Sequence, residues 1–93
     1  MYDDDDWDDP IAIEIGCVGR VFLIRNAEEA SDCIIDDWPI EDGAALNEAL
    51  AVCIDVAQGI ASSQQAREAF LKAVDEAAPL VQLIGIGSQR TKL

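Results

Sequence analysis

The chain has 93 residues, enough for one domain with a modest hydrophobic core. Half of the residues are hydrophobic, which excludes a disordered chain, yet the formal net charge is −13 and there is no histidine. This charge argues against nucleic acid, whose phosphates attract basic residues, and against anionic membrane surfaces. No segment approaches the roughly 20 apolar residues of a membrane span.

Residues 1–9 contain six of the nineteen acidic residues and are predicted to be a disordered acidic tail. The tail would increase solubility, and two further roles stay open, docking a basic partner and weak binding of a divalent cation. The rest of the chain has thirteen acidic and six basic residues, a net charge of −7. Because the N-terminus is acidic, we expect no secretory signal peptide.

Residues 10–87 are predicted to form a single domain that begins with a β-hairpin. Ile11, Ile13 and Ile15 alternate with smaller or polar residues, which is the period of a strand with one apolar face. The segment "RVFLIR", Arg20–Arg25, is β-branched and apolar, and a glycine-containing turn precedes it. We expect it to pair with the first strand in an antiparallel hairpin.

The first predicted helix runs from an Asn26 cap to about Asp37. Glu29 lies three residues after Asn26, as in a capping box. The predicted buried stripe has the i, i+3, i+4 spacing of a helix and consists of Ala27, Ala30, Ile34 and Trp38. Pro39 ends this helix.

Two more helices follow. Asp42 is the predicted N-cap of a helix from Gly43 to about Gln58, which is so apolar that we expect it to be the central core element. Ser62 or Ser63 caps a third helix, which runs to about Ala78. Its predicted inward stripe consists of Ala66, Phe70, Ala73, Val74 and Ala77.

The segment Leu80–Ile86 is strand-like, and residues 88–93 are expected to be frayed. It would either complete the sheet as a third strand or pair with a second subunit in a homodimer, because an exposed apolar edge favours association. The predicted fold class is α+β, an N-terminal antiparallel hairpin packed on three helices in the order β-β-α-α-α, with this segment as a C-terminal third strand.

Few individual residues are candidates for catalysis or for binding a metal or cofactor. Without histidine the commonest general base is missing, and we expect no catalytic, cofactor-binding or metal-binding residues. Cys33 and Cys53 fall near helix stripes and are expected to be buried free thiols, while Cys17 lies beside the turn and is expected to be exposed. Three widely spaced cysteines indicate a reducing, cytoplasmic location. Arg67 is expected to form an ion pair with an acid of the first or second helix.

One corner of the chain gathers acids without a nearby base. In "DDWPIEDG" the residues Asp36, Asp37, Trp38, Glu41 and Asp42 surround the joint between the first two helices. Asp36 and Asp37 lie at a helix C-terminus, where the helix dipole disfavours anions. We expect Trp38 to pack at the end of the first helix. The corner is the first candidate for contact with a basic partner or a cation.

Three segments of the sequence resemble a known family. They are "GRVFLIRNAEEA", "DDWPIEDGAALNEALAVCIDVAQG" and "AREAFLKAVDEA". In this order they resemble a small domain-of-unknown-function family that occurs in many copies in rhizobial and related proteobacterial genomes. The resemblance covers residues 10–78 and implies a small intracellular bacterial protein, without an activity to carry over.

The favoured function is a small acidic, non-catalytic interaction or regulatory module that meets a basic protein. The alternative is a small-molecule or divalent-cation binding protein that uses its acidic surface. An enzyme with a carboxylate pair as acid and base is a third reading.

Overall fold

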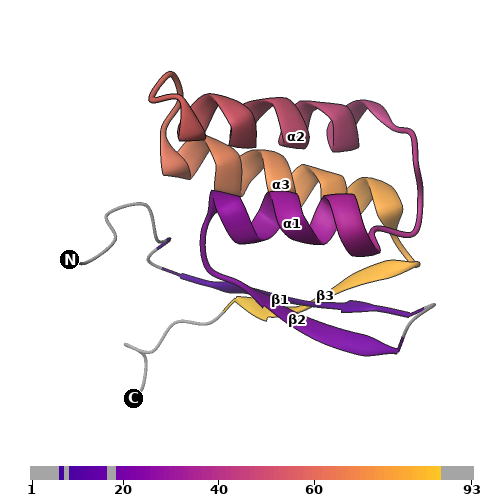
Figure 1. Ribbon diagram of the computed structural model, residues 1–93. Helices are drawn as coiled ribbons and strands as arrows, with labels where there is room; N and C mark the ends of the chain where they lie inside the picture. The colour runs from indigo at the N-terminus through magenta and orange to yellow at the C-terminus, as the bar shows by residue number, and fades with distance from the viewer. Residues whose placement is uncertain (1–6, 8, 17–18, 87–93) are drawn as a thin grey trace, which may run out of the picture.

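The computed structural model describes residues 7, 9–16 and 19–86 and has the predicted α+β fold. The expected acidic tail at 1–6 and 8, Cys17, and the expected frayed end at 88–93 lie outside the described residues. In Figure 1 the helices gather on one face of the sheet. In chain order the elements are β1 (Ile11–Ile15), β2 (Arg20–Ile24), α1 (Ala27–Asp37), α2 (Ala44–Ala57), α3 (Ser63–Ala77) and β3 (Val81–Ile86).

The sheet is antiparallel with the strand order β2-β1-β3, so β1 lies in the middle. Ile13 is opposite Phe22 on one side and opposite Leu83 on the other. The C-terminal segment therefore completes the sheet as a third strand. Ile11, Ile13 and Ile15 have no exposed surface, as their alternation predicts for a strand with one covered face. Within the described residues, strands β2 and β3 are the two edges of the sheet.

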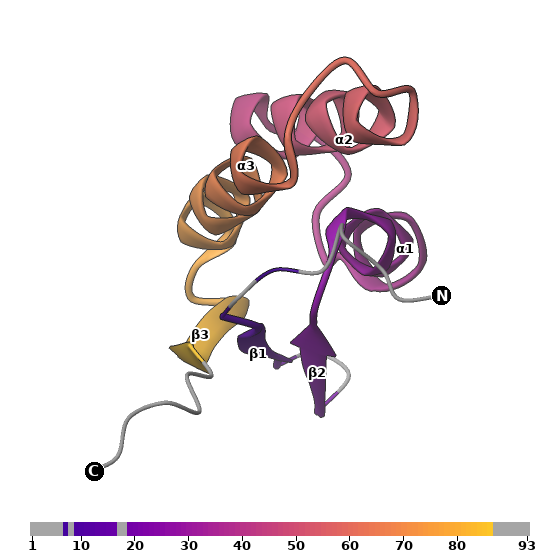
Figure 2. The same cartoon turned by 90° about the vertical axis from the view of Figure 1, so that its left-hand side faces the viewer.

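The helices form two layers over this sheet. Figures 1 and 2 show α1 above the β2 side, α3 above the β3 side, and α2 outside both, farthest from the sheet. The expectation that this second helix is the central core element was wrong. Of its apolar residues only Leu46, Ala49 and Cys53 are buried, and Ile54 is half exposed. Apolar content shows how much surface a helix can bury, but it does not show which helix lies against the sheet.

The predicted stripes of α1 and α3 are confirmed. Ala27, Ala30 and Ile34 of α1 are buried, and so is Trp38 at its end. All five predicted stripe residues of α3 are buried. Small alanines bring α3 close to its neighbours, and fully buried Phe70 fills the space between them.

Helix caps agree with the sequence at α1 and α3. The Asn26 side chain accepts a hydrogen bond from the Glu29 N–H, 2.8 Å away, at the start of α1. Ser62 caps α3 in a full capping box with Gln65, in which each side chain bonds the other residue's backbone N–H. Because these bonds span three residues, a local sequence pattern is enough to predict them.

The start of α2 is held by a residue from another helix. Asp42 is not its cap, because Gly43 occupies the N-cap position and makes no side-chain bond. Instead, the Glu76 carboxylate from the last turn of α3 accepts the N–H groups of Ala45 (3.1 Å) and Leu46 (3.0 Å). A negative charge at a helix N-terminus is favoured both by these free N–H groups and by the helix dipole. Glu76, an exposed residue of its helix, thus ties α3 to α2.

Trp7 belongs to the core, which corrects the expectation of a mobile tail at this residue. Its side chain is 6% exposed, and its backbone N–H donates to the Arg25 carbonyl at 2.7 Å. The ring centroids of Trp7 and Trp38 lie 6.1 and 5.6 Å from that of Phe70, in tilted pairs. An aromatic trio thus joins the N-terminal segment, the joint after α1 and the middle of α3.

Arg67 has a different partner from the one expected. It forms no ion pair with α1 or α2 within the described part of the chain, and its Nε donates to the Asp9 backbone carbonyl at 3.1 Å. The guanidinium thereby fixes the segment that leads from Trp7 into β1. A backbone acceptor 58 positions away leaves no trace in a sequence pattern.

Gly43→Ala should lower the free energy of unfolding by about 1–3 kcal/mol, because the Glu76 carboxylate must move away from the added methyl group and lose its bonds to the start of α2. An added Cβ would lie 2.7 Å from the Glu76 Cδ, closer than real carbon atoms approach. In a Glu76→Ala background the same change should cost less than about 1 kcal/mol, because only the weaker capping of alanine remains. Chemical denaturation of the four proteins measures this coupling, and equal costs in both backgrounds would contradict it.

Trp7→Ala should lower the free energy of unfolding by about 3–5 kcal/mol, as expected for a buried aromatic ring. Ile35→Ala is the matched control, because that side chain is 67% exposed and its loss should change stability by less than about 0.5 kcal/mol. If thermal or urea unfolding shows the two variants to be equally stable, Trp7 is not part of the core.

Candidate functional site

A groove runs between the edge strand β2 and helix α1. It has a volume of about 210 Å³, and the three consecutive residues Phe22, Leu23 and Ile24 form its β2 side. Its α1 side consists of four carboxylates and one thiol, from Glu29, Asp32, Cys33, Asp36 and Asp37. The groove therefore has an apolar wall and an acidic wall along the same strand edge. We call it the acidic groove.

The acidic wall follows from the spacing of α1. Glu29, Asp32 and Asp36 are three and four residues apart, which places them on one ridge of a helix. Asp32 and Asp36 are exposed, and among the described residues neither forms an ion pair. Like charges at i, i+4 destabilise a helix, and the last turn of α1 carries acids but no base. The wall is thus electrostatically unfavourable for the isolated domain.

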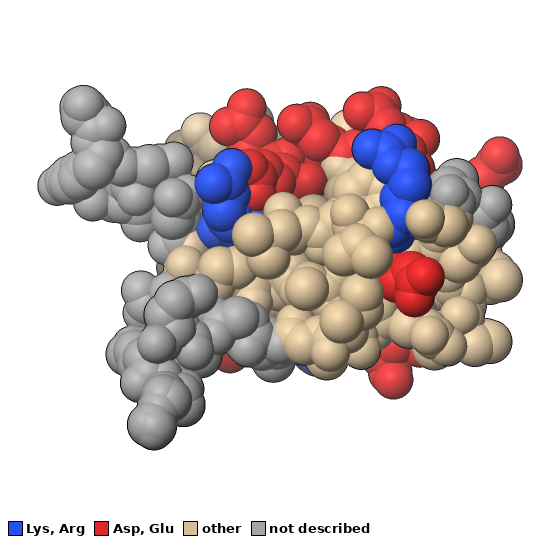
Figure 3. Space-filling view, turned by 90° about the horizontal axis from the view of Figure 1, so that it is seen from below, with Lys and Arg blue, Asp and Glu red and all other residues tan. Residues whose placement is uncertain are grey.

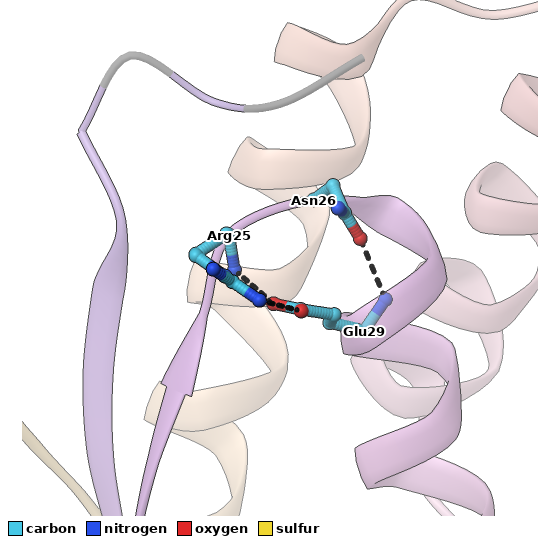
Figure 4. Close-up of polar contacts among 3 residues, drawn as sticks. All are labelled: Arg25, Asn26 and Glu29. Atoms are coloured by element: carbon cyan, nitrogen blue, oxygen red, sulfur yellow. Dashed lines mark hydrogen bonds and ion pairs between the residues drawn. The ribbon is translucent and has the colours of Figure 1, made fainter. Parts of the chain in front are cut away.

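One base lies at the end of this ridge. The Arg25 Nη2 and the Glu29 Oε2 are 2.7 Å apart, and the Glu29 Oε1 accepts the Arg25 backbone N–H at 2.8 Å (Figure 4). The side-chain hydrogen bond from Arg25 is the main cause that lowers the pKa of Glu29. Glu29 also lies beside the Asn26 cap, so its position is set by local bonds. This exposed ion pair adds little stability. Because local bonds hold its carboxylate, Glu29 forms an ordered end of the acidic wall.

The apolar wall belongs to an unpaired strand edge. Within the described residues β2 pairs only with β1, so its outer backbone groups are open for pairing. Arg20 already places its guanidinium 5.0 Å above the Phe22 ring. This cation–π contact holds a basic side chain of the protein itself on the ring. Seen from the open side of the sheet, Figure 3 shows an apolar surface bordered by a row of acidic side chains.

The structure divides the predicted acidic corner. Asp36 and Asp37 line the acidic groove, while Trp38 is buried in the aromatic trio. Glu41 and Asp42 are exposed on the connection to α2 and do not line the groove. Glu29 and Asp32, which the sequence reading left out of the corner, take their place. The helical spacing of these acids could have indicated that they share one ridge of α1. Only the position of α1 beside β2 makes this ridge one wall of a groove.

The two described cysteines are buried free thiols, as predicted. Burial raises the pKa of the Cys33 thiol to about 12, and the nearby negative charges of Asp37 and then Asp36 add to this effect. Burial alone raises the pKa of Cys53 to about 11. Both thiols stay protonated at neutral pH and are poor nucleophiles and poor metal ligands. Cys33 therefore contributes packing to the groove rather than chemistry.

Two further findings bear on function. Within the part of the chain that the structure describes, no three acidic or cysteine side chains converge as a metal site would require. No helix in that part combines the length and the apolar character needed to cross a membrane.

Comparison with known proteins identifies the family. The family model described as "Protein of unknown function (DUF982)" matches residues 9–81. This match covers most of the chain, from the segment before β1 to the start of β3, so the chain belongs to this family. Comparison with curated proteins and with solved structures gave no match.

The Cys33 thiol should make stability fall at alkaline pH. Folding raises its pKa from 9.0 to about 12, so the folded chain keeps a proton that the unfolded chain releases. This contribution is complete below the unfolded pKa and is lost as the pH rises toward the folded pKa. Between about pH 7.5 and about pH 10.5 the wild type should lose about 1–2 kcal/mol more than Cys33→Ala, at roughly 1.4 kcal/mol per pH unit. Denaturant titrations under reducing conditions measure both losses, and equal losses would refute the shift.

Proposed function

We propose that this member of the DUF982 family is a small, non-catalytic protein-interaction module that binds a basic protein segment in the acidic groove. The carrying observation is the acidic wall of α1, in which Asp32 and Asp36 face solvent beside an open strand edge. These charges repel one another and the helix C-terminus, and lysines or arginines of a partner would relieve that repulsion.

The binding mode that fits the groove is strand addition. A partner segment in extended conformation pairs its backbone with the open edge of β2, which supplies affinity without regard to sequence. Alternate side chains of a strand point to one face, so every second residue would lie on the α1 side. Basic residues at these positions meet Asp32 and Asp36, and apolar residues at the others meet the strand surface around Leu23. The proposed partner motif thus alternates basic and apolar residues.

Small-molecule or divalent-cation binding is the second candidate and has less support. A hard cation needs several oxygen ligands at about 2.0–2.6 Å. The carboxylates of the groove are spread along a ridge instead, and no group of three ligands converges among the described residues.

The remaining parts of the proposal concern the absence of catalysis, the cellular location and the source of the protein. A chain without histidine lacks the usual general base, which supports a non-catalytic role. The protonated, buried thiols of Cys33 and Cys53 suit a reducing compartment, which supports a cytoplasmic location as part of the proposal. The resemblance to a family from rhizobial and related genomes supports a bacterial source.

A designed peptide tests the proposal directly. The probe is a fluorescent decapeptide that alternates lysine and valine, and its binding is followed by fluorescence anisotropy. The Asp32→Asn, Asp36→Asn double variant should bind about three- to tenfold more weakly than the wild type, because two ion pairs are lost. Binding should also weaken as the salt concentration rises.

Two controls separate the groove from general acidity. Glu48→Gln together with Asp55→Asn removes the same charge from α2, outside the groove, and should leave affinity nearly unchanged. A peptide N-methylated at alternate residues keeps its charge but cannot pair with a strand edge, and it should bind poorly. Equal losses in both double variants would refute the acidic groove, and equal binding of both peptides would refute strand addition.

A further inference from the structure

The second open edge of the sheet differs in chemistry from the first. Strand β3 pairs with β1 on one side only within the described residues. It carries large apolar side chains in solvent, with Leu83 45% and Ile84 53% exposed, and Leu80 just before the strand is 45% exposed. A long apolar edge of this kind promotes association with another strand.

An apolar groove lies beside this edge. It has a volume of about 420 Å³ between the second half of α3 and β3. Leu71, Val74, Pro79 and Leu83 are among its lining residues, and Asp75 is the one charged residue among the described residues that line it. Leu83 is opposite Ile13 in the sheet register, so the exposed side chain belongs to the edge and to the groove wall at once. The strand thus offers both an apolar side chain and a place to receive one.

Charge decides which partner fits here. The carboxylates of the acidic groove lie on α1 at the β2 side, whereas β3 and α3 lie at the opposite side of the molecule (Figure 2). Strand β3 itself contains no charged residue, so two copies can approach through it with little repulsion despite the acidic composition. Among the described residues, this edge has no row of carboxylates that a basic partner could contact. The same edge of a second copy offers a suitable contact, because it has both an apolar strand and an apolar groove.

We propose that two copies of this chain form a homodimer by antiparallel pairing of β3 with β3. A two-fold axis midway between the two paired strands makes the contact self-complementary and joins the two sheets into one of six strands. Leu83 of each copy then lies against the apolar groove of the other. Both β2 edges stay at the outer ends of the joined sheet, so the dimer presents two acidic grooves.

Sedimentation equilibrium of the full chain over a concentration series tests the dimer. The wild type should have twice the chain mass, and this should persist at high salt because the contact is apolar. Leu83→Lys should raise the dissociation constant at least about tenfold, since it places a charge in an apolar contact in both copies. Val21→Lys is the matched control on β2, where the side chain is 63% exposed, and it should stay dimeric.

Hydrogen exchange gives a second readout that needs no variant. The amides of β3 that do not face β1 should exchange more slowly at high protein concentration than at low concentration. Circular dichroism confirms that Leu83→Lys is folded. A monomeric mass at all concentrations, exchange in β3 independent of concentration, or dissociation by Val21→Lys as strong as by Leu83→Lys would each overturn the proposal.

Discussion

The central strand β1 is the element on which the rest of the domain depends. Its three isoleucines are completely buried under the helices, and both other strands pair with its backbone. With three strands in the described part of the chain, β2 and β3 are both edges, and helices of that part cover only one face. The protein therefore presents two strand edges of different chemistry. Helix α1 gives the β2 edge an acidic border, and α3 gives the β3 edge an apolar one.

Two long-range contacts hold the helices in the positions that create these borders. The Glu76 carboxylate fixes the start of α2 against the end of α3, in a space left by the missing side chain of Gly43. The Phe70 ring packs against Trp7 and Trp38, which come from two other parts of the chain. None of the residues in these contacts lines either groove. The domain is thus stabilised at its centre and at one helix end, while the strand edges remain open to partners.

Sequence reasoning found the elements whose signals are local. The alternation of isoleucines predicted β1. The Asn26 cap placed the start of α1 to the residue, and Ser62 was one of two predicted caps for α3. The third strand was expected in one of two forms, and the structure has it within the same sheet. The acidic groove was found in part, because Asp36 was recognised as an acid at an unfavourable helix end. What the sequence did not contain was the neighbour of that helix face, which is set by how α1 packs beside β2.

Non-local contacts account for the errors. Trp7 lies among aspartates, and the composition of such a segment predicts a disordered tail. In the structure its ring packs against Phe70, which is far away in the sequence. Glu76 is an exposed residue of an amphipathic helix, as the sequence pattern indicates, but the pattern gives no sign of the helix start that it caps about 30 positions earlier. The most direct test of the central claim is a titration of the ¹⁵N-labelled protein with the lysine–valine peptide, followed by amide chemical shifts. We predict that the shifts concentrate in β2 and along α1 from Glu29 to Asp37. Shifts centred on α2 or α3, or none at all, would contradict the assignment of the acidic groove as the partner site.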